Sequence, residues 1–245
     1  MAMSGSIPPV RLLSAAALAT ALAACQPAAP PAQDPGAAAD AGADAVLPFE
    51  GLAPGERINF QCADLGVGAT FDEGGDSVRL SFSGQRLELP AVDAATGFRF
   101  ADDAGNELWS AGGDQTALIL AGQERRECFR SNRPSPWDVA ADNGIDFRAI
   151  GQEPGWLVEL VEGEGDGGAT LTAHLDYGQR LLEADGLQRE GDSWSGQAAD
   201  DTGVTLTVEE RACADAMSGE QFRAGATLVV DGEQYEGCGA WLQAD

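Results

Sequence analysis

Five cysteines are the residues of this chain whose type and spacing say most about its chemistry. Cys25 ends a short apolar stretch, and the other four lie far downstream as two pairs, Cys62 with Cys128 and Cys213 with Cys238. Paired cysteines in an exported protein form disulfides, and an odd count leaves one thiol to explain. We therefore expect one disulfide in each half of the chain and a different role for Cys25.

The residues before Cys25 have the features of a bacterial export signal. Arg11 precedes the run Leu12–Ala24, which is apolar or small almost throughout and too short to span a bilayer. The sequence Leu22-Ala23-Ala24-Cys25 resembles the lipobox of exported lipoproteins, and this resemblance implies a diacylglyceryl thioether on Cys25. We predict a signal peptide at residues 1–24; the alternative is an ordinary signal peptide with a chance cysteine.

Residues 25–47 form the predicted linker between the lipidated cysteine and the folded part. They are rich in proline, alanine and glycine and cannot build a core, so a disordered, extended spacer is expected. Gln26 stands where an acidic residue would favour inner-membrane retention, so we expect an outer-membrane anchor that faces the periplasm. The prolines of residues 131–136 favour a boundary between two domains, at 48–131 and 137–245.

The charge of the chain is strongly acidic. Forty acidic and 14 basic residues give a net charge of −26, and every basic residue is an arginine. This charge argues against nucleic acid as a partner, because binding nucleic acid depends on basic side chains that neutralise phosphates. It favours a basic protein partner drawn in by long-range attraction. The alternative is that the charge serves solubility or adaptation to salt.

Both domains have the sequence pattern of β-strands. Apolar and polar residues alternate in short runs separated by turns such as Ser83-Gly84, which is typical of an antiparallel barrel or sandwich. The runs lie at 58–62, 78–82, 87–92, 98–101, 108–109 and 117–120, then at 156–160, 169–177, 204–208 and 226–230. The sequence therefore predicts an all-β protein, a small antiparallel β-barrel followed by a second small β-rich domain, with one disulfide each.

An ordered set of short motifs lies between the first two paired cysteines. It consists of Phe60-x-Cys62, Gly-x-x-Leu-x-Leu at Gly84–Leu89, Thr96-Gly97-Phe98-Arg99-Phe100, Trp109-Ser110-Ala111-Gly112 and Cys128. Over about residues 57–129 this set resembles the membrane-bound inhibitor of C-type lysozyme. The resemblance implies an eight-stranded antiparallel barrel, anchored by a lipid, that plugs the active-site cleft of C-type lysozyme with a loop.

The inhibitory pattern of that family is Ser-Gly-x-x-Tyr with a lysine in Trp-x-Lys-Gly, and this chain differs at three positions. Thr96 replaces the serine and keeps the hydroxyl, Phe100 replaces the tyrosine, and Ala111 replaces the lysine. The predicted partner-binding residues are Thr96, Gly97, Arg99, Phe100 and Ala111. Loss of the lysine removes a charge-assisted hydrogen bond of about 1.5–3 kcal/mol, which lowers affinity about 10- to 100-fold unless Arg99 or another arginine replaces it.

The second domain carries a different signature around its cysteines. Its parts are Gly151–Trp156, Cys213–Gly219 followed by Phe222, Asp231-Gly232 and Gly237-Cys238-Gly239. Together they resemble an uncharacterised envelope lipoprotein domain and, distantly, the META domains of heat-shock lipoproteins, which implies a related fold and no activity. The residues themselves predict that the Cys213–Cys238 disulfide closes a hairpin-like excursion, and that the glycines beside Cys238 permit close backbone approach.

Residues for catalysis or for a cofactor are scarce. The only histidine, His174, lies in an alternating strand, and no Ser-His-Asp order with a nucleophile turn can be built around it. Zinc is disfavoured because the cysteines are paired and one histidine remains. The acidic stretch Glu162–Gly168 offers carboxylates for calcium but lacks the ligand spacing of known loops, so we interpret it as a solvated turn. We expect no catalytic residue, metal site or cofactor.

Two kinds of function remain for this chain. The first is a lipid-anchored inhibitor of C-type lysozyme whose Thr96–Phe100 loop enters the enzyme's cleft. The second is a non-inhibitory outer-membrane lipoprotein with an envelope-structural or stress-protection role in the second domain. Ala111 favours the second function, whereas Thr96-Gly97 and the disulfide frame favour the first. In the second case Thr96-Gly97 is only a turn, and in both cases we expect Trp109 to serve packing.

Overall fold

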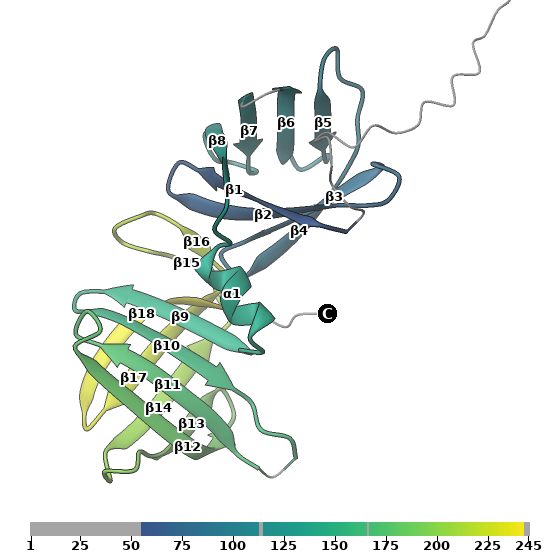
Figure 1. The fold of residues 1–245 in the computed structure, drawn as a ribbon. Coiled ribbons are helices and arrows are strands. Elements are labelled where there is room, and N and C mark those ends of the chain that lie inside the picture. Colours follow the sequence, from purple (N-terminus) through teal and green to yellow (C-terminus); the bar gives the residue numbers. More distant parts are fainter. Residues whose placement is uncertain (1–54, 113–114, 166, 243–245) are drawn as a thin grey trace, which may run out of the picture. The chain divides into compact units, whose positions relative to one another are not determined.

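The computed structural model describes residues 55–112, 115–165 and 167–242, and nearly all of its regular structure is β-strand (Figure 1). The all-β prediction is therefore confirmed. The predicted signal peptide, Cys25 and the linker at 25–47 lie outside the described residues. Within the described part of the chain, no helix has both the length and the apolar character needed to cross a membrane.

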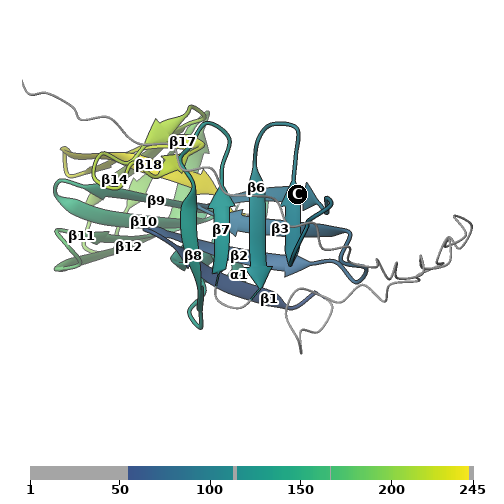
Figure 2. The same ribbon diagram turned by 90° about the horizontal axis from the view of Figure 1, so that it is seen from above.

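The first sheet contains eight antiparallel strands. They are β1 (Arg57–Cys62), β2 (Leu65–Phe71), β3 (Ser77–Phe82), β4 (Gln85–Pro90), β5 (Phe98–Ala101), β6 (Glu107–Gly112), β7 (Gln115–Ile119) and β8 (Arg126–Ser131). The spatial order β4-β3-β2-β1-β8-β7-β6-β5 is a meander in which the first strand also pairs with the last. Strands β5–β8 cross strands β1–β4 (Figure 2), and the apolar core fills the space between the two halves.

The first sheet closes incompletely, at the junction of β4 and β5. A single antiparallel bridge joins Ala91 to Phe100, and the Val92 amide donates a hydrogen bond of 2.9 Å to the Arg99 carbonyl. The predicted barrel is thus eight-stranded and barrel-like, but no continuous ladder runs between its two edge strands. This matters for the site, because the chain between β4 and β5 is held at both ends by these contacts.

The predicted disulfide between Cys62 and Cys128 is present and lies where the meander closes. The two residues stand directly opposite each other on β1 and β8, and both are buried. The bridge spans 66 residues of sequence, and closing such a loop restricts the unfolded chain by about 4 kcal/mol in the chain-entropy model. The disulfide therefore reinforces the strand pair that joins the two halves of the sheet.

The second sheet is a closed barrel of eight antiparallel strands. They are β9 (Phe147–Gln152), β10 (Gly155–Val161), β11 (Ala169–Leu175), β12 (Arg180–Glu190), β13 (Ser193–Gln197), β14 (Gly203–Glu209), β17 (Ala224–Val230) and β18 (Glu233–Trp241). Neighbours in the chain are neighbours in the barrel, and β18 pairs with β9 to close it. The interior is filled by buried aromatic and aliphatic side chains, among them Phe147, Trp194 and Tyr235.

The signature around the second disulfide has the predicted structure. The short pair β15 (Cys213–Ala214) and β16 (Gln221–Phe222) is inserted in the chain between β14 and β17, and Cys213 is bonded to Cys238 on β18. A Cβ on Gly237 would lie 2.0 Å from the carbonyl oxygen of Ile150, and one on Gly239 would lie 2.5 Å from that of Arg148. The glycines beside Cys238 are therefore needed for the close approach of β18 to β9.

Sequence comparison of the two halves shows no repeat, yet their topologies correspond. Each is an eight-stranded meander whose first and last strands pair. A short helix, α1 (Pro136–Asp142), connects them in the stretch predicted as a junction. Ser135 caps it: the Ser135 hydroxyl accepts a hydrogen bond of 3.1 Å from the Asp138 amide and donates one of 2.8 Å to the Asp138 carboxylate. The domain limits 48–131 and 137–245 stay predictions.

The β3–β4 turn, at Ser83-Gly84, contacts residues of the second half of the chain. Ser83 and Gly84 both have positive φ, 49° and 67°, as a two-residue type I′ turn requires. The Ser83 hydroxyl donates a hydrogen bond of 2.5 Å to the Glu220 carboxylate, and Gln85 donates one of 2.8 Å to the Gln221 carbonyl. Gly84 lies against Ala240, where a Cβ would approach to 2.5 Å.

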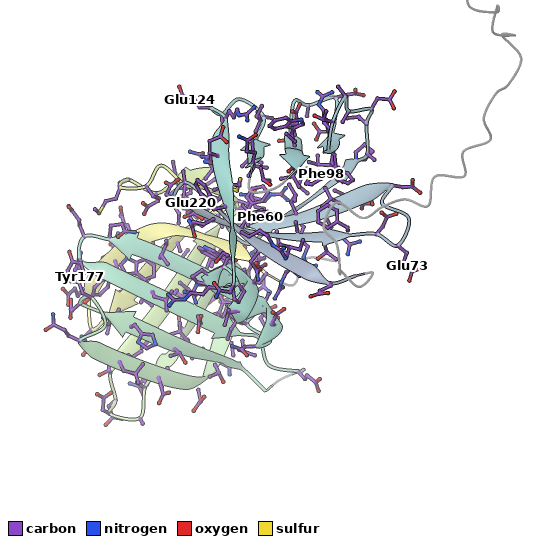
Figure 3. The ribbon with its side chains drawn as sticks, turned by 45° about the horizontal axis from the view of Figure 1, so that its top comes forward. Phe60, Glu73, Phe98, Glu124, Tyr177 and Glu220 are labelled. Atoms are coloured by element: carbon purple, nitrogen blue, oxygen red, sulfur yellow. A yellow bond between two sulfur atoms is a disulfide. The ribbon has the colours of Figure 1, made fainter. Side chains whose placement is uncertain are left out.

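Glu220, labelled in Figure 3, is predicted to make stability depend on pH. Burial raises the pKa of the Glu220 carboxyl, and the carboxylates of Asp64 and Asp215 act in the same direction. The folded state then binds a proton more tightly than the unfolded state, so this group's contribution is complete at low pH and is lost as pH rises through the raised pKa. Glu220→Gln should raise the free energy of unfolding at pH 7 and leave it unchanged in acid.

Denaturant unfolding at a series of pH values checks this expectation. Glu124→Gln removes the same charge at an exposed position, also labelled in Figure 3, and should show no such gain. Equal effects of the two substitutions at pH 7 would contradict the assigned role of Glu220.

Candidate partner-binding loop

The predicted contact residues lie at one end of the β5–β6 hairpin. The loop between β4 and β5 contains Thr96 and Gly97, and residues 93–97 of this loop are all exposed. Phe98 at the start of β5 pairs with Ser110 near the end of β6, so the loop lies beside Ala111. The structure thus brings Thr96, Gly97 and Ala111 together, although 14 residues separate Gly97 from Ala111 in the sequence.

Gly97 determines how closely the loop approaches β6. Its φ is +67°, in the region that favours glycine, and a Cβ at this position would lie 1.9 Å from the Ser110 carbonyl oxygen. It would also lie 2.9 Å from the carbonyl carbon of Ala111. No side chain fits there without displacing the strand backbone. Thr96 is therefore presented to solvent from a backbone fixed directly against the end of β6.

Phe100 supports the loop from the core. Its side chain is 2% exposed and packs on Phe71 of β2 and Phe98 of β5, with ring centroids 5.5 and 5.7 Å away. Phe98, labelled in Figure 3, also meets Phe71 edge-on at 6.0 Å. Phe100 was predicted as a partner contact, and the structure places it among core residues, where its ring holds the start of β5 in position.

Arg99 is directed away from Ala111. Its guanidinium donates hydrogen bonds of 2.7 and 3.0 Å to one carboxylate oxygen of Glu107. Glu107 begins β6, four residues before Ala111, which corresponds to roughly 13 Å along a strand. The Glu107 carboxylate raises the pKa of Arg99 and holds its side chain at the far end of the hairpin. Arg99 in this conformation does not replace the cation that the sequence comparison finds missing at Ala111.

Arg125 is a second cation beside β6 that sequence reasoning missed. Its guanidinium carbon lies 5.1 Å from the centroid of the Trp109 ring, a cation–π contact, and its Nε donates a hydrogen bond of 3.0 Å to Glu127. Trp109 and Ala111, two residues further on in β6, are both partly exposed. The cation was missed because only the strand register, which pairs Trp109 with Ala117 and Ala117 with Glu127, brings Arg125 close to Trp109.

The opposite end of the hairpin is fixed by a side-chain turn. The Asp102 carboxylate accepts a hydrogen bond of 2.9 Å from the Asn106 amide nitrogen and one of 2.7 Å from its side-chain amide. These bonds lower the pKa of Asp102. Asn106 in turn accepts a hydrogen bond of 2.8 Å from the amide of Ala121. The hairpin that carries the candidate loop is therefore anchored at its far end, which limits its freedom to tilt.

The second sheet carries the other residues considered for chemistry. His174 is exposed on β11, opposite Leu157 and Leu181 on the neighbouring strands. Glu162, in the acidic stretch predicted as a turn, accepts a hydrogen bond of 2.8 Å from Arg189. Across the described ranges, histidine, cysteine and acidic residues form no group of three or more arranged to hold a metal ion.

Comparison with known proteins gives one match. Residues 60–125 match the model of a protein family described as membrane-bound lysozyme-inhibitor of c-type lysozyme. The matched segment extends from β1 to the turn before β8 and includes the candidate loop and Ala111. No curated protein and no solved structure matches the chain. The match confirms the resemblance inferred for the first domain, and the resemblance inferred for the second domain stays a prediction.

Two glycines of the same hairpin provide a matched test of the close approach. Gly105 also has a positive φ, +94°, but a Cβ there would meet no atom within 4 Å. Gly105→Ala should therefore lower the free energy of unfolding only by the penalty for an alanine at positive φ, about 1–2 kcal/mol. Gly97→Ala should cost at least about 1 kcal/mol more, because the β6 backbone must move. Urea unfolding of both variants measures the difference, and equal costs would show that the loop does not press on Ser110.

Proposed function

We propose that this protein is a lipid-anchored, periplasmic inhibitor of C-type lysozyme that acts by inserting the loop of residues 93–97 into the enzyme's cleft. The observation that carries the proposal is the packing of Gly97 against the end of β6, which fixes Thr96 beside Ala111. The family match of residues 60–125 supplies the partner. The action is steric, so the protein needs no catalytic residue, metal or cofactor for it.

The loop has the properties that such an insertion needs. It projects exposed residues from a backbone that is held at one side by the Val92–Arg99 hydrogen bond and at the other by Gly97. A pre-organised loop loses little conformational entropy on binding, which favours affinity. The hydroxyl of Thr96 is placed to donate a hydrogen bond to a carboxylate, and lysozyme cleaves its substrate with carboxyl groups.

The negative charge of the protein favours its encounter with a basic enzyme more than it strengthens the bound complex. The net charge of −26 attracts a basic enzyme over long distances, and this attraction weakens as salt rises. Alanine stands at position 111, and the arginines Arg99 on β5 and Arg125 just before β8 are already paired with Glu107 and Glu127. We infer that short-range affinity rests on Thr96 and on the fit of the loop.

The anchor belongs to the same proposal. A lipid on Cys25 and a spacer at residues 25–47 would tether the inhibitor to the outer membrane and leave it free to meet an incoming enzyme in the periplasm. Tethering raises the inhibitor's effective concentration near the cell wall without any new contact.

A charge placed on the loop tests insertion. Thr96→Glu puts a carboxylate against the carboxyl groups of the cleft, and such like-charge contact should weaken inhibition by about 10-fold or more. Ala104→Glu adds the same charge at an exposed position in the turn at the opposite end of the hairpin and should leave inhibition unchanged. The readout is lysis of cell-wall substrate by a C-type lysozyme at low and physiological salt, with folding of each variant checked by circular dichroism.

Three outcomes separate the possibilities. Inhibition at physiological salt that is lost only in Thr96→Glu supports loop insertion. Equal weakening by Thr96→Glu and Ala104→Glu would reduce the effect to general charge. Lack of inhibition by the folded wild-type protein at both salt concentrations would refute the proposal.

Restoring the missing cation should strengthen the inhibitor. Ala111→Lys places an ammonium group on the outward face of β6 beside the loop, where it can form a charge-assisted hydrogen bond with a carboxylate. We expect inhibition to improve about 10- to 100-fold, because such bonds contribute about 1.5–3 kcal/mol. Ala104→Lys controls for the added charge alone. An Ala111→Lys variant no better than the control would mean that position 111 does not face the enzyme.

A further inference from the structure

Several arginines line a cleft that is separate from the candidate loop. The cleft has a volume of about 1220 Å³, and five of the chain's 14 basic residues line it: Arg57, Arg79, Arg86, Arg211 and Arg223. This concentration is unexpected in a protein with a net charge of −26. We propose that the cleft binds a small ligand that carries two or more oxyanion groups, carboxylates or phosphates.

The first wall of the cleft is a cross-strand row on the outer face of β1–β4. Arg57 stands opposite Thr70, Thr70 opposite Arg79, and Arg79 opposite Glu88, and all four line the cleft. Directly opposed residues of antiparallel strands place their side chains on the same face. The β-sheet register therefore places two guanidinium groups on one face, two strands apart.

A second row, next to the first, brings a third arginine to this wall. Ser81 stands opposite Arg86, so Arg86 is the diagonal neighbour of Arg79 across β3 and β4. Diagonal neighbours are roughly 7–8 Å apart at the backbone, which is within reach of long side chains. Arg79 is exposed and forms no ion pair with any described residue. Arg79 therefore keeps its guanidinium donors available for an anion in the cleft.

The other wall supplies Arg211 and Arg223. The Nε of Arg223 donates a hydrogen bond of 3.3 Å to the side-chain oxygen of Gln85, the neighbour of Arg86. This partner is neutral, and Arg223 forms no ion pair with any described residue. Arg211 pairs with Glu209 at 2.8 Å, and its guanidinium lies on the backbone of Gly225, where a Cβ would be 2.7 Å from Nη2. The absence of a side chain at Gly225 is what allows Arg211 to reach this position.

Four acidic residues also line the cleft, and one of them forms an ion pair with a cleft arginine. Asp142 binds Arg57, Glu88 accepts a hydrogen bond of 3.2 Å from Ser77, and Asp138 is held by Ser135 at the start of α1. Glu210 also lines the cleft and is exposed. The Asp142–Arg57 pair contributes little to an added ligand, and the serine hydrogen bonds leave the charges of Glu88 and Asp138 in place. Arg79 and Arg223 can still form charge-assisted bonds. These two arginines are the expected principal ligand contacts.

The floor of the cleft suits a compact ligand. A Cβ on Gly68 would lie 2.5 Å from the Ser81 hydroxyl, and the absence of that side chain keeps the hydroxyl accessible as a donor. Leu87, Trp241 and Leu242 add apolar surface. The volume is that of a site for an organic molecule larger than a single inorganic ion, and guanidinium groups bind planar carboxylates and phosphates in pairs of hydrogen bonds. A polycarboxylate or a phosphorylated small molecule fits this lining.

Calorimetric titration of the purified full chain tests the site. Citrate and pyrophosphate serve as probes, each compared with sodium chloride at matched ionic strength. We expect saturable binding of at least one probe, weakened about 10-fold or more in Arg79→Ala/Arg223→Ala. Arg133→Ala/Arg180→Ala removes the same charge outside the cleft and should bind as the wild type does. Thermal unfolding establishes that both double variants are folded.

Each outcome bears on the proposal. Binding of citrate alone or of pyrophosphate alone identifies the ligand's anionic group and supports the site. Lack of saturable binding at millimolar concentration, or equal affinities of the two double variants, overturns it. Lysozyme inhibition is measured on the same samples, and it should be unchanged in Arg79→Ala/Arg223→Ala because neither arginine belongs to the loop. The anion site and the inhibitory loop can therefore fail independently.

Discussion

Pairing between the first and last strand of each meander is the constraint on which the rest of the structure depends. In the first sheet β1 pairs with β8, and the Cys62–Cys128 disulfide joins the two strands at directly opposed residues. Without this pairing, strands β5–β8 would have no fixed relation to strands β1–β4. The aromatic contact of Phe71 with Phe98 and Phe100, which supports the candidate loop, joins the same two halves. The closure of the sheet therefore determines where the loop lies.

The incomplete pairing between β4 and β5 leaves room for the candidate loop. Strands β4 and β5 share one bridge instead of a full ladder, so the chain between them is free to form a projecting loop. In the second sheet the corresponding ladder is continuous and the interior is filled. Two sheets of the same topology thus differ where the first carries its candidate contact residues. A loop at an incomplete seam can be exposed and still have a defined backbone, because both of its ends are hydrogen-bonded or sterically fixed.

The net charge of the protein and its individual arginines act over different distances. A net charge of −26 acts at long range and favours encounter with a basic protein, whatever the details of the surface. The arginines act at short range. Arg99 on β5 is held by Glu107, and Arg125 just before β8 is held by Glu127. Arg79 and Arg223 line a cleft and form no ion pair with any described residue. The same acidic chain can in this way attract a cation over a distance and hold an anion in one place.

The β3–β4 turn links local sequence to tertiary contact. Ser83-Gly84 was recognisable as a turn from its residue types alone, because glycine tolerates the positive φ that a two-residue hairpin requires. Its second role became visible only in the fold: Ser83 binds Glu220, and Gly84 leaves room for Ala240. Burial in this contact is also what raises the pKa of Glu220, which the sequence presents as one acid among 40.

The sequence by itself determined the all-β class, both disulfide pairs, several turns and the family resemblance of the first domain, because these depend on residue type, alternation and short spacing. It missed β2, four of the eight strands of the second barrel (β9, β12, β13 and β18) and the helix after Ser135, whose patterns are short or interrupted. Only the tertiary structure decided that Phe100 is buried, that Arg99 points to Glu107 and that Arg125 lies on Trp109. The physical reason is register: strand pairing brings together residues that are distant in the chain, and no local pattern records which partners will meet.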